Sequence, residues 1–363
     1  MKQKNRIGAA GLYTLFLISR LPPLLTVVSP ADAAELADRC VLFAPLSLLL
    51  LLAGVPMLPF ASAPSRGLLS VSKNRSKTLC AALTGLYTFT VLWDAAAGTA
   101  QFKLFVDGVM YPDVPVLPLM LLFFAAAVFI AAKGIETTAR MGAVIGVLLA
   151  ATLASVLLTT LPRAEALNLE PPLQKGTLSF LKSALHAAAR TGEPLALYAF
   201  TGRVAGKKRA GYALWCVGFP ALGSLLFASL LSVAGKSAVN QMFSLYTLTV
   251  LSRLGPSAHP DALIAAVWVL CFLVRTAFYL QTAGAFLSQG FGIKESAPLF
   301  LILGCAVLAG SLLIGADPSV FSRITSAPVG EALFLLTMFI LPVFVHLTRR
   351  KTPEEIAEKR RRL

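Results

Sequence analysis

The 363-residue chain is strongly apolar, with 57% hydrophobic and only 13% charged residues. Its mean hydropathy of +0.77 excludes an ordinary soluble domain, in which about 25% of residues are charged. Lys and Arg outnumber Asp and Glu by 32 to 17. These basic residues form short clusters between apolar stretches, which indicates a membrane-orientation signal rather than a nucleic-acid-binding face. Five scattered Cys without a CxxC pair predict neither a disulfide framework nor a zinc site.

Apolar stretches of about 20 residues predict transmembrane helices, because only helices satisfy their own backbone in lipid without closing a barrel. No small-residue cleavage motif follows the basic N-terminus promptly, so we expect a retained first span rather than a signal peptide. The predicted fold class is an all-α integral membrane protein with a single domain. Its halves are 8–161 and 183–347, followed by a tail, 348–363. The ten predicted spans are 8–29, 38–60, 79–106, 115–132, 140–161, 183–201, 211–234, 260–288, 297–315 and 329–347.

The distribution of basic residues predicts the orientation of these spans. The N-terminus, the loops after even-numbered spans and the tail together hold 21 of the 32 Lys and Arg residues, and the opposite side holds 8. Positive charge is retained on the cytoplasmic side of a membrane. We therefore expect both termini to be cytoplasmic.

The stretch Leu185–Thr201, within the sixth span, has Gly192, Glu193 and Pro194 at its centre. Gly adds backbone freedom, and Pro removes a donor and disfavours helix at the preceding residue. Interrupted backbone at membrane depth is tolerated only where protein or a watery cavity covers it. We therefore predict a binding site at this break.

The first span carries a second proline-containing stretch, Ser19–Pro23, near its middle. Ten spans divide into five and five, and an odd number of spans per half inverts the halves in the membrane. Interrupted helices at corresponding positions of inverted halves indicate a transporter-type midplane site. The alternative is that Pro merely kinks each helix.

Charged residues inside membrane spans are costly and indicate function by default. They are Arg20, Asp94, Arg190, Glu193 and Arg275. Three Arg against two acids, with a half-helix beginning near Pro194, favour a carboxylate-bearing ligand. Carbonyl groups near the break, with a carboxylate, suit an ammonium group. Together these groups suit an amino acid zwitterion, although a sugar or nucleoside also fits. The predicted ligand-binding residues are Arg20, Pro22, Trp93, Asp94, Arg190, Thr191, Gly192, Glu193 and Arg275.

Two alternatives remain for these charges. Internal salt bridges, for example Asp94 with Arg275 or Glu193 with Arg20, could serve packing alone. An enzyme is not expected, since the chain has no HExxH, GxSxG, P-loop or paired metal-ligand motif. We accordingly predict no catalytic residues, no metal and no cofactor.

The stretch Ala131–Arg140, A-A-K-G-I-E-T-T-A-R, resembles the endospore germination permease family. Members of this family are the membrane-spanning B subunits of GerA-type germinant receptors. The resemblance implies the amino acid–polyamine–organocation superfamily and a leucine-transporter-type fold of 5 + 5 inverted repeats with broken helices 1 and 6. The supporting pieces are Leu161-Pro162, Asn168–Pro171, Gly176, Gly192-Glu193 and Asp261–Trp268.

The same resemblance implies a function and partners. It implies a subunit in the spore inner membrane that binds a small germinant, with an amino acid as the expected ligand, and signals to an A subunit and a lipoprotein C subunit. Membrane lipid is a further expected partner and nucleic acid is not. The alternatives are an amino acid permease working by alternating access, and a passive scaffold. In the implied fold, spans 1, 3, 6 and 8 surround the substrate. We assign structural or gating roles to Gly134, Glu136, Arg140 and Pro194.

Overall fold

The computed structural model describes residues 6–25, 33–60, 67–110, 114–240, 243–252, 261–325 and 328–348. Within these ranges the chain is almost entirely helical, apart from one two-residue strand pair. The elements in order are β1 (Ile7–Gly8), α1 (Ala9–Leu25), α2 (Ala33–Val41), α3 (Phe43–Met57), α4 (Leu68–Arg75), α5 (Lys77–Phe105), the π-helix η2 (Val106–Met110), α6 (Val116–Lys133), α7 (Ile135–Thr160), η3 (Leu161–Arg163), η4 (Ala166–Asn168), α8 (Thr177–Ala189), η5 (Glu193–Leu195), α9 (Ala196–Ala199), β2 (Val204–Ala205), α10 (Lys208–Ala234), η6 (Gly235–Asn240), α11 (Ser244–Leu251), α12 (Asp261–Phe291), α13 (Ala297–Ile314), α14 (Pro318–Thr325), α15 (Val329–Leu335), the π-helix η7 (Leu336–Ile340) and α16 (Leu341–Leu347).

Seven helical segments in the described ranges are long and apolar enough to cross a membrane. They correspond to predicted spans 3, 4, 5, 7, 8, 9 and 10. The second predicted span is a helix pair, α2 and α3, bent by 54°. The first span is the shorter helix α1, and the sixth is divided between α8 and α9. The arrangement is compatible with ten spans, of which the second is bent and the sixth is divided.

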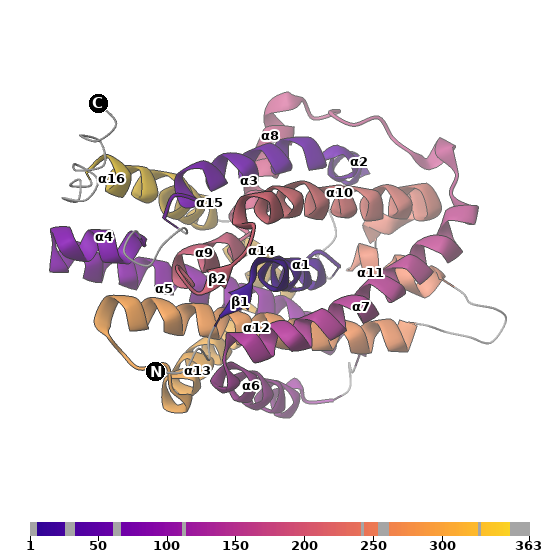
Figure 1. The fold of residues 1–363 in the computed structure, drawn as a ribbon. Coiled ribbons are helices and arrows are strands. Elements are labelled where there is room, and N and C mark those ends of the chain that lie inside the picture. Colours follow the sequence, from indigo (N-terminus) through magenta and orange to yellow (C-terminus); the bar gives the residue numbers. More distant parts are fainter. Residues whose placement is uncertain are drawn as a thin grey trace.

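Helix α1 lies inside the bundle. Figure 1 shows it with α10 on one side and α7 and α12 on the other, and it packs against all three. The strand β1 precedes α1 and pairs in parallel with β2, with Ile7 opposite Val204 and Gly8 opposite Ala205. This pairing ties the start of the first span to the end of the sixth. The two helices that the sequence singles out are therefore neighbours in the fold.

The predicted interruption of the first span at Ser19–Pro23 is wrong, because α1 is helical from Ala9 to Leu25. Pro22 and Pro23 have no N–H group, so the carbonyls of Ile18 and Ser19, four residues earlier, lack their usual helical donors. Arg275 Nη1 donates to the Ser19 carbonyl at 2.8 Å. A guanidinium thus replaces one of the two missing amides, and the helix continues to Leu25.

The interruption of the sixth span is present. Helix α8 ends at Ala189, and three residues follow before the 3-10 turn η5 begins at Glu193. Residues Glu193–Ala199 then form only about two turns. This short second half has a weak dipole, so a ligand carboxylate would depend on side-chain cations rather than on the helix end.

Candidate functional site

Four elements meet at the break in the sixth span: α1, α5, the connection between α8 and α9, and α12. Each contributes at least one of the charged residues that the sequence indicates, and hydrogen bonds join them into one network. The network is almost entirely buried, with Arg275 3%, Glu193 1% and Asp94 9% exposed. Charges removed from water in this way must be paired or hydrogen-bonded.

Arg275 of α12 is the centre of the network. Its Nη1 donates to Glu193 Oε1 at 2.9 Å and to the Ser19 carbonyl, and its Nη2 donates to the Asp94 backbone carbonyl at 3.2 Å. A Cβ at Gly98 would lie 2.7 Å from Arg275 Nε, so α5 admits the guanidinium only because this residue is glycine. One side chain therefore links α1, α5 and the broken sixth span.

The ion pair differs from both pairings suggested by the sequence. The carboxylate partner of Arg275 is Glu193, whereas Asp94 offers Arg275 only its backbone oxygen. Arg20 does not reach Glu193. It donates to the carbonyls of Arg190 at 2.7 Å and Ala187 at 3.3 Å, which are acceptors left free at the end of α8. A cation at a helix C-terminus is favourable, so Arg20 caps the break.

Hydrogen bonds at the break narrow the prediction for a ligand ammonium group. The sequence suggests that the carbonyls around Thr191 and Gly192, with Glu193, are available to it. The Gly192 carbonyl accepts from the Leu195 amide at 3.1 Å, whereas the carbonyls that Arg20 takes are those of Arg190 and Ala187. Among the described residues no donor reaches the Thr191 carbonyl, so this acceptor is left for an ammonium group beside a side-chain carboxylate.

Arg190 is held by a neutral partner. Its Nη2 donates to Gln101 Oε1 at 3.1 Å, and the amide of Gln101 donates to the Pro23 carbonyl at 2.8 Å. The guanidinium also lies 5.8 Å from the centre of the Phe321 ring. Within the described residues no carboxylate pairs with Arg190, so its charge is available to an anionic group.

Asp94 provides the negative charge that complements the positive charge of Arg190. In the described part of the chain its carboxylate accepts no hydrogen bond and forms no ion pair, although the residue is buried. A Cβ at Gly192 would lie 1.9 Å from Asp94 Oδ2, so this carboxylate touches the break directly. Tyr279 Oη and Glu193 Oε2 are further buried oxygens without a partner among the described residues. Polar groups left unpaired in this way favour an added donor.

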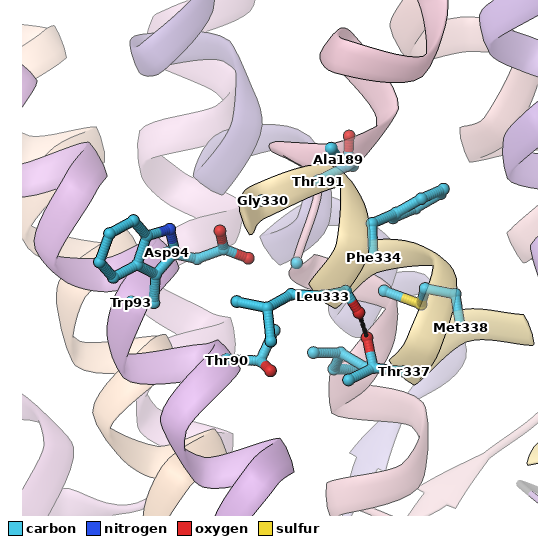
Figure 2. A pocket seen from close by; sticks show the side chains of 12 residues that line it. Thr90, Trp93, Asp94, Ala189, Thr191, Gly330, Leu333, Phe334, Thr337 and Met338 are labelled. Carbon is cyan, nitrogen blue, oxygen red and sulfur yellow. Dashed lines mark hydrogen bonds between the residues drawn. The ribbon is translucent and has the colours of Figure 1, made fainter. Parts of the chain in front are cut away.

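Two small cavities lie beside these groups. One, of about 10 Å³, is lined by Asp94, Trp93, Thr191 and Gly192. Figure 2 shows Asp94 and Trp93 on one side of it and Phe334 and Thr337 of the α15–η7 segment opposite. The second, of about 30 Å³, is lined by Arg20, Asp94, Arg190, Arg275 and Trp93, among others. A water needs about 10–15 Å³, so both cavities are closed to an amino acid in this conformation.

Helices α14 and α15 form the wall that closes the cavities. Ile324 and Thr325 of α14 and Gly330 of α15 line the 30 Å³ cavity. His186 Nδ1 of α8 lies 3.4 Å from Glu331 Oε1 of α15, on the partly exposed side of the wall. This ion pair is one of the contacts by which α15 packs against α8.

The remaining predicted residues fall into two groups. Pro194 is buried in the first turn of η5, and Pro22 lies within α1, although its side chain is outside the described part of the structure. Gly134, Glu136 and Arg140 lie apart, at the junction of α6 and α7, where they line a separate cavity of about 470 Å³. Arg140 Nη2 donates to Glu136 Oε1 at 2.6 Å, the pairing across one turn expected from their spacing.

Sequence reasoning missed three residues as site members. Gln101 follows Asp94 by seven positions and Tyr279 follows Arg275 by four, so each shares a helix face with a charge that was identified. Tyr279 also lies 4.5 Å below the Arg275 guanidinium. Ser19 was named only as part of a break, yet its carbonyl and hydroxyl both join the network. Helical spacing around the buried charges would have found the first two.

Comparisons with known proteins bear on the family and the fold. A family model described as spore germination protein (Spore_permease) matches residues 40–317. The structure is similar to a substrate-bound, outward-open Na⁺-coupled sialic acid symporter, with a TM-score of 0.60 and 12% identity over 93% of this chain and 80% of the symporter. It is also similar to the Eremococcus coleocola manganese transporter, with a TM-score of 0.53 and 13% identity over 94% and 76% of the two chains. No curated protein sequence matches the chain.

These similarities confirm the predicted fold class. The chain is an all-α, multi-pass membrane protein with the leucine-transporter-type fold. In the first helix, the break is a loss of backbone hydrogen bonding at Pro22 and Pro23 rather than an end of the helix. The fold is that of permeases and transporters rather than of enzymes.

Proposed function

We propose that this chain, which belongs to the spore germination protein family, is a permease-like receptor subunit that binds a small zwitterion at the midplane site and signals to partner subunits. The observation that carries the proposal is the pair of unmatched charges, Asp94 and Arg190. Both line the 30 Å³ cavity, one without a partner among the described residues and the other held by a neutral amide.

An amino acid complements these two charges. Its ammonium group would donate to Asp94, and its carboxylate would accept from Arg190, with Arg20 beside it. The bidentate fork of a guanidinium matches a carboxylate geometrically, which favours an amino acid over a sugar or nucleoside. Trp93 lines both cavities and would contact the ligand side chain.

Binding requires the site to open. A ligand can shift an equilibrium only if it binds the two states differently, and these cavities are too small for it in the closed state. We infer that the α14–α15 wall moves away from α8, which separates Glu331 from His186 and Phe321 from Arg190. Closure over the ligand would then alter the Arg20 and Arg275 contacts that hold the sixth span. Partner subunits would sense that change.

The partners would be a larger membrane A subunit and a lipoprotein C subunit, in the spore inner membrane with both termini of this chain cytoplasmic. Purification of the tagged chain from spore membranes tests this assembly. Co-purification of one multi-span protein and one lipoprotein is expected. Recovery of the chain alone would contradict it.

An amino acid permease is the second candidate, because the structural neighbours are transporters. Uptake of labelled amino acids into vesicles that contain only this chain separates the two functions. Binding without accumulation supports the receptor, and robust accumulation supports the permease. A passive scaffold predicts neither.

Titration of the purified chain in lipid nanodiscs tests the site. Asp94→Asn and Arg190→Gln should each weaken binding of the recognised amino acid by roughly ten- to a hundredfold, the effect of one lost charge-assisted hydrogen bond. The matched controls are Asp107→Asn, at the end of the same span, and Arg163→Gln, whose side chain is exposed. Equal binding by all four variants would overturn the proposal.

A further inference from the structure

An apolar groove runs between α1 and α10, away from the charged site. Its volume is about 790 Å³, and its walls include Tyr13 and Leu17 of α1 and Trp215, Gly218 and Leu222 of α10. The two helices touch at one end, where a Cβ at Gly211 would lie 2.5 Å from the Tyr13 ring. A Cβ at Gly218, by contrast, would have no neighbouring atom within 4 Å. The groove is therefore open beside Gly218.

The groove belongs to the surface that faces lipid. Leu214, which lines it, is 75% exposed although the protein spans the membrane. From Lys207 to Leu222 the groove follows roughly 22 Å of helix axis, at 1.5 Å per residue. One leaflet of a bilayer core is about 15 Å deep. A single acyl chain fits this length.

The end of the groove next to β1 is basic. Lys207 lines it, and Arg6 is exposed at the start of β1, two residues before Gly8 of the groove wall. The register of β1 with β2 brings Arg6 next to Arg203. Arg203 is already paired with Glu295, whose two carboxylate oxygens accept from it at 2.6 and 3.1 Å, so Arg6 and Lys207 are the cations that remain for an anionic group.

We propose that this groove binds one anionic phospholipid, with the headgroup phosphate on Arg6 and Lys207 and an acyl chain lying along α1 and α10 as far as Phe219. Basic residues at the membrane surface attract anionic headgroups, and the apolar walls accept the acyl chain. A partner helix would cover the walls but leave the two cations unmatched. The proposal stands independently of ligand binding at the midplane.

The position of Phe219 gives this lipid a route to the charged site. Phe219 lines the groove, and the Arg20 guanidinium lies 5.6 Å from the centre of its ring. An acyl chain against this ring would support the position of Arg20, which caps the end of α8. The lipid would therefore hold the first and sixth spans together.

Native mass spectrometry of the chain released from mixed phosphatidylglycerol and phosphatidylcholine nanodiscs tests the proposal. The wild type should retain one phosphatidylglycerol in preference to phosphatidylcholine. Arg6→Ala with Lys207→Ala should lower that preference by about fivefold for each cation removed. Lys73→Ala with Lys77→Ala, which removes the same charge from another basic loop, should leave it unchanged.

A second variant blocks the groove itself. Gly218→Leu places a side chain in open space and should abolish the retained lipid, whereas Gly85→Leu, an equally open exposed helical glycine on α5, should not. Leu is a better helix former than Gly, so neither change should unfold its helix. Equal retention of both lipids by the wild type would overturn the proposal. So would a dimeric wild type that Gly218→Leu converts to a monomer, because a protein surface would then fill the groove.

Discussion

The two proline-containing spans meet the same chemical problem in different ways. In α1, Pro23 leaves the Ser19 carbonyl without a helical donor, yet the helix continues to Leu25. In the sixth span, the helix stops at Ala189, and its end carbonyls are left free. A guanidinium group donates to each set: that of Arg275 to the Ser19 carbonyl, and that of Arg20 to the carbonyls of Arg190 and Ala187.

The difference lies in how many carbonyls are left without a donor. Pro22 and Pro23 remove two N–H groups inside α1, which leaves the carbonyls of Ile18 and Ser19; Arg275 satisfies that of Ser19, and the helix continues. A helix end leaves up to four carbonyls, so one Arg caps only part of it and the chain changes direction. The comparison suggests that proline alone does not break a span when a buried cation replaces its donor.

Loss of Arg275 should have the largest effect. Arg275→Met leaves Glu193 charged and buried and the Ser19 carbonyl unpaired, which should lower the free energy of unfolding by about 3–5 kcal/mol. Thermal unfolding in detergent measures this. The double variant with Glu193→Met should recover most of the loss, because no isolated charge remains. If the double variant were as unstable as Arg275→Met alone, the loss of stability would come from lost packing rather than from an isolated buried charge.

Loss of Arg20 should have a smaller and differently placed effect. Arg20→Gln removes the charged donor to the Arg190 and Ala187 carbonyls, at a cost of about 1.5–3 kcal/mol. Amide hydrogen exchange should rise near Thr191 and stay unchanged along α1. Arg275→Met should show faster exchange in α1. If both variants raised amide hydrogen exchange in the same helix, Arg20 and Arg275 would not stabilise different segments.

Restoring the missing amide in α1 should have a small effect alone. Pro23→Ala returns a donor to the Ser19 carbonyl, so stability should change by less than about 1 kcal/mol in the wild type, and it should recover about 1 kcal/mol in the Arg275→Met background. Pro194→Ala should give no such recovery with Arg20→Gln, because the helix axis ends there. A double-mutant cycle measured by chemical unfolding decides between these outcomes.

Loss of Asp317, which caps the N-terminus of α14, should have the smallest effect. This cap is exposed, in contrast to the buried guanidinium groups of Arg20 and Arg275. Asp317 Oδ1 accepts from the Ser319 hydroxyl at 2.6 Å and from the Val320 and Ser319 amides at 3.0 and 2.7 Å, and these hydrogen bonds, first that of the hydroxyl, lower the pKa of its carboxyl. Its stabilising contribution is therefore present above the unfolded pKa of about 3.9 and lost as the pH falls through the lower folded pKa. The difference in unfolding temperature between wild type and Asp317→Ala should narrow below that pH. A constant difference would contradict this, and Ser322→Ala is the control.

The sequence predicts the fold well because apolar runs and basic loops determine spans directly. It also identifies the charges, since Arg20 and Arg275 are conspicuous in apolar surroundings. It does not identify the partner of each charge, because spacing along one helix says nothing about the rotation of another. Gly98 and Gly192 decide that pairing by admitting Arg275 and Asp94, and such close approaches are visible only in three dimensions.

The central claim is that a small zwitterion binds between Asp94 and Arg190. Calorimetric titration of the wild-type chain in nanodiscs, with the recognised amino acid, its methyl ester and the corresponding decarboxylated amine, tests it most directly. The account predicts that only the zwitterion binds well, because the ester and the amine leave Arg190 without an anion. Equal affinity for all three compounds, or no binding by any of a full panel of amino acids, would contradict it.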